Sequence, residues 1–199
     1  YDFGNPGIAA RNHEQALVKN IVRFADAVRT IKCKYLSGQV WEYKTLDTAV
    51  LGWLVERVSG GSTVAAYTAQ RLWEPLGAEA DATWIIDASG QEVTFAYVNA
   101  VLRDWARLGL MLANRGNWQG KMVIPADWLA ASAADALSLD PPPGKYGYQI
   151  WYSDDTRRFS LRGLRGQYVI VDPDLKLVVV QTALSGGLPE FSELLAELR

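Results

Sequence analysis

Two hydrophobic periodicities divide the sequence, and their order constrains the fold more than any other feature. Up to about residue 134, apolar residues recur at three- and four-residue steps, which predicts amphipathic helices. After residue 147 they alternate or run continuously over short segments, which predicts strands. Helices followed by an antiparallel meander and a closing helix are typical of an α+β domain. This segregation argues against a Rossmann-type sheet, and the sequence contains neither a G-x-G-x-x-G nor a Walker motif.

Capping and breaker residues set the expected bounds of these elements. Helices are predicted over residues 12–33, from Thr45 or Asp47 to Gly60, from Ser62 or Thr63 to Trp73, from Asn99 to Asn114, after Pro125, and over 189–198. Strands are predicted over 83–87, 91–95, 122–124, 148–152, 158–162, 167–171 and 175–181, with a stiff loop over 137–146. The continuous apolar run at 177–180 predicts a strand that is covered on both faces.

Composition and charge exclude several classes of function. The net charge is −2, from 20 Lys and Arg against 22 Asp and Glu, and nothing in it indicates nucleic-acid binding, which favours a basic face. No apolar segment reaches the ~18 residues that span a bilayer. Cys33 is the only cysteine and His13 the only histidine, which excludes an internal disulfide and a zinc cluster of cysteines. We expect no metal, no other cofactor, no nucleic-acid partner and no membrane segment in this chain.

The segment Trp41-Glu42-Tyr43-Lys44-Thr45 carries the first candidate for chemistry. It is an aromatic-rich extended piece that leads into a helix at Tyr43. A phenol at such a junction lies near backbone N–H groups and the positive end of the helix, with an ammonium close by. These features favour the phenolate, and a tyrosine that ionises readily can act as a general base near neutral pH. The alternative is that Tyr43 only packs, which is the commoner role of a tyrosine before a helix.

The second candidate is a strand end interrupted by glycines, Leu161-Arg162-Gly163-Leu164-Arg165-Gly166-Gln167. Glycine within a strand marks a bulge or the close approach of another group. Backbone N–H groups exposed at such a point can donate hydrogen bonds to a carbonyl oxygen that gains negative charge. The alternative interpretation is a simple turn between two strands.

The order of these and further segments resembles that of the β-lactamase-related serine hydrolases. Residues 41–56 are similar to the second active-site box of this grouping, which includes class C β-lactamases, DD-peptidases, esterases and 6-aminohexanoate-dimer hydrolases. The dimer hydrolases are the nearest in pattern. The resemblance covers about residues 30–199, and its specificity lies in an ordered set of further segments at 72–77, 102–109, 120–129, 146–151 and 162–168.

The resemblance implies a β-lactamase/transpeptidase-like fold, with an antiparallel sheet flanked by helices, and an acyl-transfer mechanism. In the family, a serine in an S-x-x-K box attacks an amide or ester carbonyl, and its lysine and the second-box tyrosine move the proton. Tyr43 matches that general acid/base. Gly163 and Leu164 match the third-box wall, where the Leu164 N–H would contact the oxyanion. Thr45 and Arg162 match substrate-binding positions.

The chain departs from the family pattern in three ways. No serine is followed three residues later by lysine, so the S-x-x-K box is missing. In the family that box lies on a helix upstream of the tyrosine, and truncation explains its absence more simply than mutation. The second box reads Tyr43-Lys44-Thr45 where many members have Tyr-x-Asn. Leu161-Arg162-Gly163 stands in place of Lys-Thr-Gly, which argues against β-lactamase or peptidase activity and leaves esterase or linear-amide hydrolysis more open.

We therefore expect residues 1–199 to form a single partial serine-hydrolase domain, cut from a longer protein and lacking the S-x-x-K helix. No signal-peptide pattern is present, and both a cytoplasmic and a periplasmic location stay open. The expected function is cleavage of a small amide or ester, with the fragment inactive alone. The alternatives are a non-catalytic binding or regulatory module of the same fold, and a separate chain that docks with a serine-bearing partner. An exposed sheet edge would favour self-association.

Overall fold

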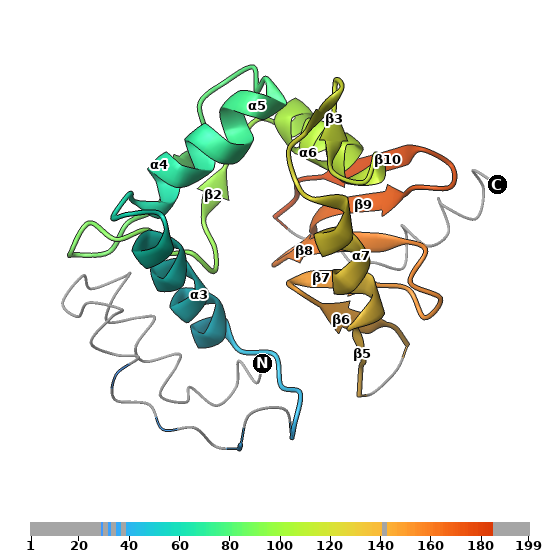
Figure 1. Cartoon of the computed structure of the whole chain (residues 1–199), viewed down its shortest axis with the longest axis horizontal. Helices are drawn as coiled ribbons and strands as arrows, with labels where there is room; N and C mark the ends of the chain where they lie inside the picture. Colours follow the sequence, from blue (N-terminus) through green and yellow to red (C-terminus); the bar gives the residue numbers. More distant parts are fainter. Residues whose placement is uncertain (1–28, 30–31, 33–34, 37–38, 141–142, 185–199) are drawn as a thin grey trace. The chain divides into compact units, whose positions relative to one another are not determined.

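The computed structural model describes residues 29, 32, 35–36, 39–140 and 143–184, so the helices predicted over 12–33 and 189–198 lie outside it except for two positions. The chain forms two compact units (Figure 1). Unit 1 takes in Tyr1–Arg71 and Ala82–Asn99, and unit 2 takes in Leu72–Asp81 and Ala100–Arg199. Both contain helices and antiparallel strands, which confirms the α+β class. The single partial domain over 1–199 stays a prediction.

Helix α3, Thr45–Val58, is the longest helix of unit 1 among the described residues. Its N-cap is Lys44, whose backbone is extended (φ −136°, ψ 126°), and no side chain caps it. The predicted cap at Thr45 or Asp47 is therefore wrong, because Thr45 is already helical. The helix ends at the glycine pair as predicted, where the Gly61 N–H reaches back into the last turn with a hydrogen bond of 3.0 Å.

The next helix is shorter than predicted and is followed by two further turns. Helix α4, Val64–Thr68, begins after Thr63, whose hydroxyl accepts the Ala66 N–H at 3.1 Å, as expected of a capping residue. A π-helical turn, η2 (Ala69–Trp73), and a short helix, α5 (Glu74–Leu76), then complete the path that we predicted as one helix.

A single indole determines how the strands of unit 1 pair. Strands β1, Thr83–Trp84, and β2, Val98–Asn99, are antiparallel partners, and the hairpin predicted over 83–95 is reduced to one β-bridge. The Trp84 indole N–H is shared between the carbonyls of Val93 and Ala96, at 3.0 Å each. This contact holds the returning chain off the path of the predicted strand, so that pairing resumes only at β2.

The longest helix of unit 2 among the described residues has a cap that we mispredicted. Helix α6, Leu102–Ala113, has Val101 as its N-cap, because Asn99 is paired within β2. The remaining elements before the sheet are the hairpin of β3 (Asn117–Trp118) with β4 (Lys121–Met122), and helix α7 (Ala126–Ala134), which follows Pro125.

A six-stranded antiparallel sheet, in the order β10-β9-β8-β7-β6-β5, forms the body of unit 2 (Figure 1). All four strands predicted after residue 147 are present. Two short strands also occupy the segment predicted as a stiff loop, because the Leu139 N–H bonds the Gly144 carbonyl at 2.9 Å and closes a hairpin there. The strands are β5 (Leu137–Ser138), β6 (Lys145–Gly147), β7 (Ile150–Tyr152), β8 (Phe159–Gly163), β9 (Gln167–Asp172) and β10 (Leu177–Gln181).

Helix α6 lies directly against the sheet and carries most of one buried apolar cluster. The core side chains on α6 are Leu108, Met111 and Leu112, joined by Leu76 from α5. Contact is closest at Gly109, where a Cβ atom would lie 2.4 Å from Val178 of β10. Strand β10 itself is half-buried along its length, and not fully buried as a strand covered on both faces would be.

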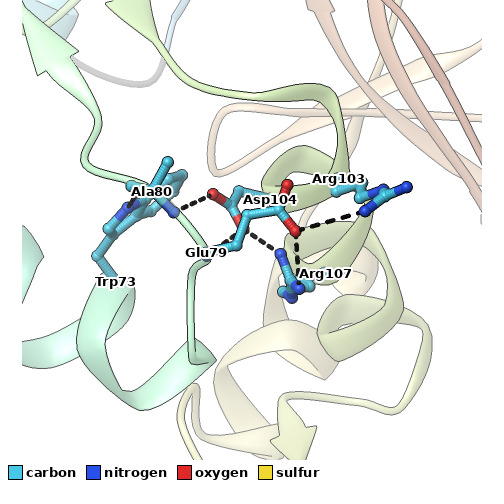
Figure 2. Close-up of polar contacts among 6 residues, drawn as sticks. All are labelled: Trp73, Glu79, Ala80, Arg103, Asp104 and Arg107. Carbon is cyan, nitrogen blue, oxygen red and sulfur yellow. Dashed lines mark hydrogen bonds and ion pairs between the residues drawn. The ribbon is translucent and has the colours of Figure 1, made fainter.

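A buried carboxylate ties α6 to the loop before it (Figure 2). Asp104 is fully buried, and its oxygens accept the N–H groups of Glu79 at 2.9 Å and Ala80 at 3.3 Å. Arg107 donates to the same carboxylate and pairs with Glu79 at 3.2 Å. The hydrogen bond to Asp104 raises the pKa of the Arg107 guanidinium. Because a buried charge is tolerated only when donors and a counter-charge replace water, this cluster fixes the loop onto α6.

Replacing Asp104 with alanine is expected to lower the free energy of unfolding by about 3 kcal/mol, since it orphans two loop N–H groups and removes the partner of Arg107. Urea denaturation followed by tryptophan fluorescence measures the change. The matched control is Arg103→Ala. That side chain is 82% exposed, and its ion pair with Glu79 is long, at 4.0 Å, so its removal should lower the free energy of unfolding by no more than about 0.5 kcal/mol. Equal losses in the two variants would contradict the role given to Asp104.

Candidate functional site

Tyr43 lies directly before α3 in irregular chain that pairs with no strand of the described structure. Its side chain is 45% exposed, so it is not a packed core residue. The extended backbone of Lys44 separates it from the first helical turn, whose N–H groups have no side-chain cap. Tyr43 is therefore a partly exposed residue near the positive end of a helix, which is the placement that the sequence predicted.

The ammonium next to Tyr43 is shared with a carboxylate. Lys44 Nζ lies 3.0 Å from Glu42 Oε2, and both side chains are partly exposed. Asp47 adds a second negative charge in the first turn of α3. Within four residues of Tyr43 in the sequence there are thus one cation, two carboxylates and the helix end, a more balanced set of charges than the ammonium alone. Its role as acid/base stays a prediction.

A loop of unit 1 packs against the half of α3 that follows Tyr43. Thr94 Oγ1 donates to the Thr48 carbonyl at 3.2 Å. The fit is tight, since a Cβ atom at Gly52 would lie 2.4 Å from the Thr94 side chain. Glycine at position 52 is therefore required for the loop to approach the helix. Thr45, the predicted substrate contact, is half-buried at the start of the same helix.

The same loop holds a strained aromatic residue that the sequence did not identify. Tyr97 has a left-handed backbone (φ 69°), which costs a bulky residue roughly 1–2 kcal/mol. The Asn99 amide donates to its carbonyl at 3.3 Å, and the Trp84 indole holds the neighbouring Ala96. Strain that its neighbours enforce is frequent at functional sites. Nothing in the local sequence indicates it, because it depends on contacts with β1.

The predicted third box forms the end of β8 and the turn into β9. Arg165 and Gly166 have left-handed backbones (φ 61° and 88°), and Gly163 pairs with Gln167 to close the turn. A Cβ atom at Gly163 would lie 2.8 Å from the Gln167 side chain. The glycines thus serve both a tight turn and a close approach, which combines the two interpretations of this segment.

Leu164 presents an unused backbone donor at this turn. Its side chain is 66% exposed, and its N–H makes no hydrogen bond to any part of the described chain. The turn itself is held firmly, because the Gln181 amide donates to the Gly166 carbonyl at 3.1 Å and the Gln167 amide donates to the Ala183 carbonyl. A fixed and exposed N–H of this kind can stabilise an oxyanion.

Arg162 is fixed on the strand that leads to this donor. Its Nε donates to Ser160 Oγ at 2.8 Å, and its guanidinium carbon lies 5.3 Å from the centre of the Trp151 ring. The two terminal nitrogens make no hydrogen bond or ion pair within the described residues. Although the residue is exposed overall, desolvation of the guanidinium lowers the pKa of Arg162, while Tyr168 acts in the opposite sense. Arginine nevertheless remains charged at neutral pH.

The cross-strand neighbours of Arg162 could not be found from local sequence. Trp151 lies opposite Ser160 in the β7–β8 ladder, and the Tyr146 ring packs edge-on against Trp151 at 4.9 Å between centroids. The only available signal was the two-residue spacing of Ser160 and Arg162, which places them on one face of β8. Pairing register, which sequence alone does not give, places Trp151 beside them.

The predicted residues fall into two groups, one in each unit. Tyr43 and Thr45 lie at the start of α3 in unit 1, and Arg162, Gly163 and Leu164 lie together at the end of β8 in unit 2. No group of His, Cys, Asp and Glu in the described part of the chain is arranged to hold a metal. None of the helices described is long and apolar enough to cross a bilayer.

A hollow of about 260 Å³ lies at the other end of the β8–β9 ladder and contains none of the predicted residues. It is lined by Arg157, Arg158, Asp172, Asp174 and Leu175. The Arg157 guanidinium is already paired with Asp155 at 2.8 Å. Because the hollow lies at the end of the ladder opposite Gly163, it is separate from the third-box turn.

Comparisons with known proteins identify the family of this chain. A family model described as Beta-lactamase matches residues 2–196. The chain is 32% identical to the 6-aminohexanoate-dimer hydrolase of Paenarthrobacter ureafaciens, over 90% of this chain and 50% of that protein. It thus spans about half the length of the curated relative.

Solved structures share the fold at lower identity. A protein from Bacillus anthracis, assigned as a 6-aminohexanoate-dimer hydrolase, superposes with a TM-score of 0.78 at 24% identity, over 88% of this chain and 46% of that one. A β-lactamase from Mycobacterium bovis has a TM-score of 0.59 at 21% identity, over 78% and 63% of the two chains. These likenesses confirm the predicted fold. The chain belongs to the Beta-lactamase family, among the β-lactamase-related serine hydrolases.

Proposed function

We propose that this chain supplies the acid/base tyrosine and the oxyanion-binding strand of a serine-hydrolase site for amides or esters, and that it is inactive alone. The proposal extends the family membership to particular residues. It assigns acyl-transfer roles to Tyr43 and Thr45 of unit 1, and to Arg162, Gly163 and Leu164 of unit 2. No serine of this sequence stands in an S-x-x-K box, so the proposal takes the nucleophilic serine and its lysine from another segment.

The observation that carries the proposal is the Leu164 N–H. An oxyanion needs a donor that is fixed, exposed and not already bonded to the protein. In support, Leu164 is an exposed residue, its N–H makes no hydrogen bond within the described residues, and two glutamine amides hold the turn around it. Loss of one such donor in acyl-transfer enzymes costs about 10²–10³ in kcat.

Tyr43 would move the proton in this scheme. As the serine oxygen bonds to the carbonyl carbon, the serine proton passes to the phenolate, and the phenol then protonates the leaving amine or alcohol as the C–N or C–O bond breaks. The exposure of Tyr43 at the start of α3 supports this role, since both the serine and the leaving group must reach its oxygen.

Arg162 and Thr45 would orient the substrate. The terminal nitrogens of Arg162, which bond to none of the described residues, can donate to a polar group of the substrate, and the guanidinium lies against the Trp151 ring. Thr45 offers one hydroxyl in place of an amide. Such a site favours an open-chain amide or an ester.

The second candidate function is a non-catalytic binding or regulatory module of the same fold. The observation that favours it is that no serine of this chain stands in an S-x-x-K box.

The isolated chain is expected not to hydrolyse nitrocefin or p-nitrophenyl esters, because it has no activated nucleophile. Absorbance assays at high protein concentration test this, with the Tyr43→Phe variant run in parallel to reveal background hydrolysis. Turnover by the chain that persists in the Tyr43→Phe variant would contradict the proposed mechanism.

In a longer protein that joins this chain to an S-x-x-K segment, Tyr43→Phe is expected to lower kcat by about 10²–10⁴, as for a lost general base. Steady-state kinetics with a p-nitrophenyl ester measure the effect. Tyr67→Phe is the matched control, because this half-buried tyrosine lies on α4 and keeps its ring against Arg71. An unchanged kcat in Tyr43→Phe would make Tyr43 structural and would contradict its proposed role.

A further inference from the structure

The hollow at the end of the β8–β9 ladder is lined by two opposite charges that do not pair with each other. Its lining residues belong to the β7–β8 turn and to the end of β9 with the turn that follows, which lie on the same side of the sheet (Figure 1). Phe159 lies opposite Val171 in the ladder, so the same register places Arg158 across from Asp172. Nevertheless, no hydrogen bond or ion pair joins these two side chains in the described structure. The hollow therefore has a cationic wall and an anionic wall.

The anionic wall is a buried carboxylate with an unused oxygen. Asp172 is only 6% exposed, and its Oδ1 accepts the Leu175 N–H at 3.1 Å. Its Oδ2 makes no hydrogen bond within the described residues. A buried carboxylate is destabilising unless donors or a cation replace its hydration. An ammonium that enters the hollow would supply both.

The cationic wall is the half-buried side chain of Arg158, which bonds to none of the described residues. Its backbone is fixed, because Ser153 donates to its carbonyl at 2.9 Å and accepts its N–H on the hydroxyl at 3.1 Å. The neighbouring Arg157 is committed elsewhere. It pairs with Asp155 at 2.8 Å, and hydrogen bonds from Ser153 and Arg157 hold the pKa of Asp155 well below its ordinary value. Arg158 is thus left to bind a carboxylate, to which a guanidinium can donate two parallel hydrogen bonds.

The size of the hollow and its remaining wall restrict the ligand further. The volume of about 260 Å³ equals that of roughly nine water molecules at ~30 Å³ each, which is room for a molecule of about nine non-hydrogen atoms. Leu175 adds an aliphatic wall that is 51% exposed. These features fit a short aliphatic chain with an ammonium at one end and a carboxylate at the other.

We propose that the hollow binds a short ω-amino acid, with its carboxylate on Arg158, its ammonium on Asp172 and its methylene chain against Leu175. Each charged end of such a ligand replaces the water that one wall loses, whereas a singly charged molecule leaves the other wall without a partner. The site is at the end of the ladder opposite Gly163, and it stands independently of the acyl-transfer roles proposed above.

The test is isothermal titration calorimetry of the whole chain with 5-aminopentanoate. We expect saturable binding with a dissociation constant of about 1 mM, as for a small ligand held by two charged contacts. The matched ligands are pentanoate, pentylamine and norvaline. The first two each lack one charge, and norvaline has the same atoms as 5-aminopentanoate but carries both charges at one end. All three should bind at least about tenfold more weakly.

Two variants remove the charges of the walls with little change of shape. Arg158→Gln and Asp172→Asn should each weaken the binding of 5-aminopentanoate by about tenfold or more. Arg115→Gln is the matched control, since this exposed arginine of unit 2 lies outside the hollow, and its affinity should equal that of the unchanged chain. Thermal unfolding shows whether each variant folds, and Arg158→Gln decides alone if Asp172→Asn does not.

Four results would overturn the site: no saturable heat from 5-aminopentanoate, equal affinity for one of the matched ligands, unchanged affinity in Arg158→Gln, or an equal loss in Arg115→Gln. A chain that binds none of the ligands and is destabilised equally by Arg158→Gln and Asp172→Asn would assign the two residues to a cross-strand ion pair instead.

Discussion

The buried carboxylate of Asp104 is the interaction on which unit 2 depends most. A fully buried charge is destabilising unless the protein replaces its hydration, and here two backbone N–H groups and one guanidinium do so. The same bonds fix the loop before α6 at the start of that helix (Figure 2). Helix α6 then lies against β9 and β10 at Gly109, where even a methyl group would collide with Val178. The sheet that carries the third box is thus held from one side.

The two groups of candidate residues are built on the same physical plan. Each lies where a regular element ends, so that backbone donors are left without partners inside the element. Tyr43 precedes the uncapped first turn of α3, and the Leu164 N–H follows the last residue of β8. Rigid neighbours hold both positions: the Thr94 loop beside α3, and the amides of Gln167 and Gln181 beside the β8–β9 turn. Exposure combined with rigidity is what electrostatic catalysis requires.

Much of this could be predicted from the sequence wherever the signal is local. Alternation located β7 to β10, glycine pairs located the end of α3, and the ordered segments identified the family. Predictions failed where a distant contact decides the structure. Asn99 looks like a cap, but the Trp84 indole directs the chain so that Asn99 pairs in β2. The cation–π contact of Arg162 with Trp151 depends on strand register, and the backbone strain at Tyr97 depends on hydrogen bonds to residues distant in sequence. Local sequence could therefore predict neither.

In the function proposed for it, this chain positions the substrate, protonates the leaving group and stabilises the oxyanion, while a serine of another segment attacks the carbonyl carbon. The most direct test is to locate the acyl group. A longer protein or complex that joins this chain to an S-x-x-K segment would be incubated with a p-nitrophenyl ester, quenched in acid, and analysed by peptide mass spectrometry. The acyl group should be found on the S-x-x-K serine and on no residue of this chain. A stoichiometric acyl group on Tyr43 or on any serine of this chain would contradict the account.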